Sequence, residues 1–67
     1  MLPDRDIYAT ATVMMRRYGA DAATEAAQRS DKLMADGDAD GAAVWRRVMA
    51  AIEELGRQAP REGEGVY

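Results

Sequence analysis

Residues 36–41, DGDADG, have the residue types and the spacing that open a calcium-binding EF-hand loop. Such a loop needs oxygen ligands at positions 1, 3 and 5 and a glycine at position 6. In this chain those positions hold Asp36, Asp38, Asp40 and Gly41. Position 12 should supply a bidentate glutamate, but it is Arg47, a cation where ligand oxygens belong. We therefore expect no bound metal here, and a calcium-responsive module that uses these three aspartates is our third hypothesis of function.

The same segment has a simpler explanation as the end of one helix and the start of the next. Gly37 can end a helix in a left-handed conformation. Asp38 or Asp40 can then cap the following helix, because an N-cap carboxylate accepts hydrogen bonds from the first free backbone amides. Negative charge is also favourable at the positive end of a helix dipole.

Catalytic chemistry has few side chains to use in this chain. It contains no His and no Cys, so imidazole metal ligands, thiolate sites and the catalytic triads that need either residue are excluded. Glu53 and Glu54 are neighbours, and neighbouring helical residues point about 100° apart, which makes them a poor acid–base pair. We expect a protein that is not an enzyme and that uses no cofactor.

Two arginine pairs favour a different kind of partner, a nucleic acid. Arg46 and Arg47 would lie on the second helix of a helix-turn-helix motif, and Arg16 and Arg17 form the other pair. The charge argues against it, because 12 acidic residues outnumber 9 basic ones and the net charge is -3. The aspartates before Arg46 would also repel phosphates where a reading helix enters the groove. A helix-turn-helix-like DNA-associated regulator is therefore the second hypothesis.

Three segments with helical periodicity must position these residues. Apolar residues recur at helical spacing over about residues 3–18, 21–36 and 39–57. Gly19 and Gly37 separate the segments, and Pro60 cannot continue the third. Because both joints are short, successive helices should run antiparallel. We predict an all-α fold, an up-down-up antiparallel three-helix bundle over residues 1–59, with residues 60–67 as a flexible, disordered tail.

The third segment carries the broadest apolar stripe, which includes Trp45, Val48, Met49 and Ile52. A domain of 67 residues builds only a thin core, and this stripe is wider than the other two segments need. Aromatic and methionine side chains with arginine at the rim are typical of interfaces. We therefore predict that these four residues form an interaction surface of a non-catalytic protein–protein interaction or regulatory module. Its partner would be a larger protein or a second copy in a homo-oligomer.

The sequence shows no address for secretion or for a membrane. Residues 1–6 lack a basic run followed by an apolar region, and the longest stretch without charge, residues 7–15, is too short to span a bilayer. We expect a cytoplasmic protein without a membrane partner.

Several runs of residues resemble a family of short alphaproteobacterial helical proteins to which no activity is assigned. The resemblance is carried by residues 29–34 (RSDKLM), 37–48 (GDADGAAVWRRV) and 51–55 (AIEEL). Residues 6–9, 18–23 and 63–66 fit the family too, so the resemblance covers nearly the whole chain. Residues 37–48 fit the pattern GD-x-x-G-x-x-x-W-x-x-(I/V). The resemblance implies a small helical domain in a bacterial cytoplasm, and it transfers no catalytic or ligand-binding residue. Tyr67 departs from the histidine of the family pattern at the end of the chain.

Overall fold

The computed structural model describes residues 3–58, and the predicted tail at residues 60–67 lies outside them. The regular secondary structure of the described chain is all helical, in the order α1 (Asp4–Tyr18), η1 (Gly19–Asp21), α2 (Ala22–Ala35) and α3 (Ala39–Gln58), where η1 is a single 3-10 turn. Residues 3–58 contain no strand. The predicted all-α class is therefore confirmed.

Helix α1 begins directly after Pro3, which takes the N-cap position instead of the first helical turn. The Pro3 carbonyl accepts hydrogen bonds from the backbone amides of Asp6 and Ile7 at 2.9 and 3.1 Å. At the other end Gly19, with φ 56°, donates its backbone N–H to the carbonyl of Met15. A positive φ is accessible to glycine without a Cβ clash, so Gly19 ends α1 as expected.

The joint between α2 and α3 is a Schellman motif followed at once by an N-cap. Gly37 has φ 84° and donates its N–H to the Met34 carbonyl at 3.1 Å, and the Asp38 N–H reaches the Leu33 carbonyl at 2.8 Å. The Asp38 carboxylate then accepts the Gly41 N–H at 2.9 Å. Because each of these bonds satisfies a backbone group that the helix ends leave free, the chain reverses in three residues, 36–38.

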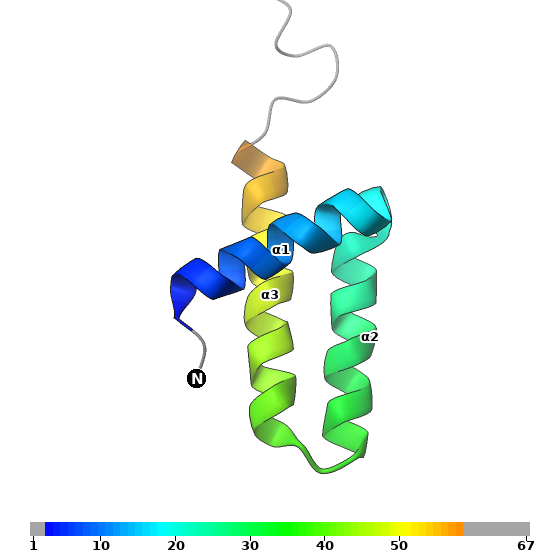
Figure 1. Ribbon diagram of the computed structural model, residues 1–67. Coiled ribbons are helices and arrows are strands. Elements are labelled where there is room, and N and C mark those ends of the chain that lie inside the picture. The colour runs from blue at the N-terminus through cyan, green and yellow to red at the C-terminus, as the bar shows by residue number, and fades with distance from the viewer. Residues whose placement is uncertain (1–2, 59–67) are drawn as a thin grey trace, which may run out of the picture.

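Helices α2 and α3 lie side by side as a hairpin, and α1 lies across both of them (Figure 1). The predicted up-down-up bundle, with three helices alongside one another, is therefore not confirmed. The physical reason is local. The η1 turn joins α1 to α2 with no loop residues, so the chain changes direction sharply at Gly19. Helix α1 buries one narrow stripe against the hairpin, formed by Ile7, Ala11 and Met14.

The core of the described chain is made mainly of small side chains. Its buried apolar members besides the α1 stripe are Ala22, Ala26, Ala42, Val48, Ala51 and Ile52. Alanines let helix backbones approach closely, which compensates for the scarcity of large apolar residues. Within residues 3–58 no helix is both long enough and apolar enough to cross a membrane.

Candidate functional site

Of the four residues predicted to form an interaction surface on α3, two are buried in the core and two are half-buried. Val48 and Ile52 are only 1% and 6% exposed and belong to the core cluster. The prediction that they face a partner is wrong for the single chain, because α1 and α2 already cover them. Trp45 and Met49 are half-buried and pack against the same core. Only this pair of the four predicted residues retains accessible surface for a partner.

Trp45 contacts Arg29, which in turn contacts Tyr18, and the sequence alone did not connect these residues. Arg29 of α2 places its guanidinium carbon 4.9 Å from the centre of the Trp45 ring and 5.9 Å from the centre of the Tyr18 ring. The same guanidinium donates a hydrogen bond from Nη2 to the Tyr18 hydroxyl at 3.0 Å. Both distances to the rings lie within the range of cation–π attraction. We call these three residues the arginine clamp.

The arginine clamp joins all three helices at one place. Tyr18 is the last residue of α1, Arg29 lies in α2 and Trp45 lies in α3, and each of them is half-buried. A signal for Arg29 was present in the sequence, since it stands three residues after Ala26 and four before Leu33, on the flank of the core-facing stripe. Tyr18 also lies at helical spacing from the α1 core stripe, four residues after Met14, but its contact with Arg29 depends on the way α1 crosses the hairpin.

The guanidinium of Arg29 makes no ion pair within the described residues. Within residues 3–58 its polar bond goes to the Tyr18 hydroxyl, although Glu25 stands one helical turn earlier on α2. An arginine has five N–H donors around the edge of a flat group, and an aromatic ring covers its face but not its edge. The stacked and half-buried Arg29 therefore keeps donors available along its edge.

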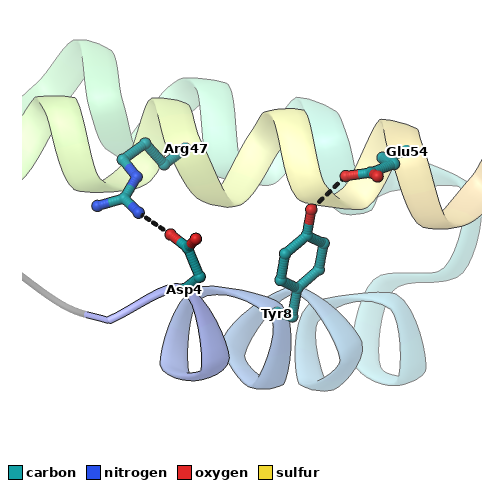
Figure 2. Close-up of polar contacts among 4 residues, drawn as sticks. All are labelled: Asp4, Tyr8, Arg47 and Glu54. Atoms are coloured by element: carbon teal, nitrogen blue, oxygen red, sulfur yellow. Dashed lines mark hydrogen bonds and ion pairs between the residues drawn. The ribbon is translucent and has the colours of Figure 1, made fainter.

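A second polar cluster connects the first half of α1 to α3 (Figure 2). The Tyr8 hydroxyl donates a hydrogen bond to the Glu54 carboxylate, and Arg47 donates from Nη2 to Asp4 at 2.5 Å in a salt bridge. These four residues border a hollow of about 200 Å³. Asp4 is highly exposed, with 83% of its side chain accessible, so the ion pair is screened by solvent.

The polar contacts of this second cluster hold α1 against α3. The hydrogen bond to Glu54 raises the pKa of the Tyr8 hydroxyl above its usual value, and desolvation and the negative charges of Glu54 and Asp4 act in the same direction. The direction of this shift moves the hydroxyl further from ionisation, so it acts as a hydrogen-bond donor and not as an activated base.

The three aspartates of the calcium hypothesis do not gather around a common point. Asp38 uses its carboxylate to cap α3, and Asp40 lies in the first turn of that helix. Within residues 3–58 no group of three or more acidic side chains is placed to hold a metal ion. The alternative explanation, that these residues form a helix joint, describes the geometry that the structure shows for Gly37 and Asp38.

The arginine pairs are likewise arranged differently from what a helix-turn-helix requires. In that motif the two helices cross at about 90–120°, whereas α2 and α3 lie side by side (Figure 1). Arg47 is engaged with Asp4, and Arg16 and Arg17 lie in the last turn of α1, on a different helix. The structure does not bring the two pairs together on one reading helix.

In comparisons with known proteins, no family model, curated protein or solved structure matches the chain. The alphaproteobacterial resemblance therefore stays a prediction.

Proposed function

We propose that this chain is a non-catalytic protein–protein interaction module whose contact surface is centred on the arginine clamp. One observation carries the proposal: tyrosine, arginine and tryptophan from three helices meet at one half-buried place. These are the residue types that dominate binding energy at interfaces. Their mutual contacts restrict the rotamers, which lowers the entropy that would otherwise be lost on binding.

The clamp supplies a centre that the α3 stripe alone lacks. Val48 and Ile52 are in the core, so the accessible part of that stripe is Trp45 with Met49, one turn later. Met49 adds a flexible apolar side chain of the kind that adapts to a partner. The proposed surface therefore combines a charged centre with an apolar flank, as the central region of many interfaces does.

Self-association is the form of the proposal that can be measured before another partner is known. Sedimentation velocity over a range of micromolar concentrations should show a dimer whose population falls in a Trp45→Ala variant. A monomer at every concentration would assign the surface to a different protein.

The same protein expressed in a bacterial host should be found in the cytoplasmic fraction.

The test for a different partner is a comparison of capture by matched variants. Arg29→Met removes the centre of the clamp, and Arg57→Met removes the same charge from an exposed position in the last turn of α3. A specific partner should be captured at least about tenfold less by the Arg29 variant and equally by the Arg57 variant, because truncating an interface hot spot costs about 2 kcal/mol or more. Equal capture by the wild-type chain and both variants would overturn the proposal. Circular dichroism melting checks that each variant is folded.

A further inference from the structure

Arg29 has no anionic partner within the described residues, and the proposed function does not by itself account for this. This guanidinium is half-buried, stacks on Trp45 and Tyr18, and has no carboxylate within ion-pair distance among the described residues. Partial burial removes water from a charged group, and a cation in that position gains most from an anion that approaches it directly. Arg47, in contrast, does have such a partner, because it forms an ion pair with Asp4.

We infer that Arg29 is the receptor for a side-chain carboxylate of the partner, so that the module binds an acidic peptide segment. This inference rests on the proposed function and names the chemistry of its partner. The stacked geometry suits the task. Trp45 and Tyr18 hold the plane of the guanidinium, one edge donor bonds to the Tyr18 hydroxyl, and other edge donors can form a forked pair with two carboxylate oxygens.

The charges along α2 and α3 around the clamp are mixed. One turn from Arg29 on α2 are Glu25 on one side and Lys32 on the other, and Arg46 follows Trp45 on α3. Glu25 forms no ion pair with Arg29 at 4 Å or less, yet its charge competes with an incoming carboxylate. Removing the Glu25 charge should therefore strengthen the binding of an acidic peptide, which a purely structural role of Arg29 would not predict.

The apolar flank favours a peptide over a small free anion. Trp45 contacts the guanidinium, Met49 lies one turn later on α3, and both keep accessible surface. A segment in which acidic and apolar residues alternate could pair with Arg29 and cover this flank at the same time. A free phosphate would use the charge alone.

The inference is tested by titrating the full chain with a short peptide of alternating glutamate and leucine, blocked at both ends. The chain contains a single tryptophan, so its fluorescence reports on the clamp. A saturable change is expected with this peptide and not with the matching glutamine–leucine peptide. Binding should weaken at least about tenfold in Arg29→Met and markedly in Arg29→Lys, which keeps the charge but loses the planar fork. It should be unchanged in Arg57→Met and tighter in Glu25→Gln. Calorimetry repeats the comparison independently of Trp45 emission.

Three results would overturn the inference: no binding of the glutamate peptide, equal binding by Arg29→Met, or inorganic phosphate binding as tightly as the peptide. Failure of the inference is distinguishable from failure of the proposed function. If the peptide does not bind but Arg29→Met still loses a captured protein, the interaction surface stands and the acidic partner is wrong. If neither capture nor peptide binding depends on Arg29, both are wrong.

Discussion

The hydroxyl of Ser30 in α2 donates a hydrogen bond to the backbone carbonyl of Ala42 in α3, at 3.0 Å. Ser30 is 3% exposed and Ala42 is 0% exposed, so the bond lies inside the hairpin. Ser30 is the buried polar residue of the described core, and its bond brings the side chain of one helix to the backbone of the other. The small size of both residues is what permits this approach.

Replacing Ser30 by alanine should lower the free energy of unfolding by about 0.5–1.5 kcal/mol, the usual net contribution of a hydrogen bond. Urea denaturation followed by circular dichroism measures the change. The control is Thr24→Ala, at an exposed position of the same helix. Equal stability of the two variants would show that the bond to Ala42 contributes nothing.

Two glycine-to-alanine substitutions should have opposite effects on stability. Gly37→Ala places a Cβ in the left-handed conformation at φ 84° and should cost about 1–2 kcal/mol. Gly56 lies inside α3 with no atom within 4 Å of an added Cβ, so Gly56→Ala should stabilise the fold by about 0.5–1 kcal/mol. Thermal melts of both variants give the comparison. A tolerated alanine at Gly37 would contradict the Schellman motif described above.

Alanine substitutions of Asp38 and Asp36 distinguish the effect of helix capping from the effect of removing a negative charge. Asp38→Ala removes the cap on the Gly41 amide and should destabilise the chain by about 0.5–2 kcal/mol. Asp36 lies at the C-terminal end of α2, where negative charge is unfavourable, so Asp36→Ala should be neutral or slightly stabilising. Equal losses in both variants would instead indicate that the acidic residues act together. Melting with millimolar calcium should leave the wild-type midpoint unchanged if capping is their role.

The pKa of Tyr8 should lie above the usual value of about 10, because the hydrogen bond to Glu54 favours the protonated hydroxyl. The folded state then holds this proton more tightly than the unfolded state. The stabilisation is fully present below the unfolded pKa and is lost as the pH rises through the folded pKa. Tyrosinate absorbance, with Tyr8→Phe to assign the signal, should show this pKa falling toward its usual value in Glu54→Gln. An unchanged pKa in that variant would exclude Glu54 as the cause.

Much of the helical content followed from local chemistry in the sequence. Gly19 and Gly37 end helices because glycine adopts a positive φ without a Cβ clash. The sequence also indicated that either Asp38 or Asp40 caps α3. That Asp38 is the cap depends on the backbone hydrogen bonds of the joint. Helix ends and caps depend on interactions between residues a few positions apart, so they can be predicted from the sequence.

The candidate site could be predicted only in part, because it is assembled from residues far apart in the chain. The apolar periodicity of α3 placed Trp45 on the same face as Val48 and Ile52. The periodicity of one segment could not predict that other helices cover Val48 and Ile52. Periodicity says which residues share a face, and it does not say at what angle another helix crosses that face.

The sequence alone determined the all-helical class found for residues 3–58, the three segments separated at Gly19 and Gly37, and the exclusion of histidine and cysteine chemistry. The tertiary structure decided that α1 lies across the hairpin, that Val48 and Ile52 are core, and that Arg29 stacks on Trp45 beside Tyr18. The physical reason is range: caps and propensities act between neighbours in the chain, whereas burial and stacking depend on how whole helices pack.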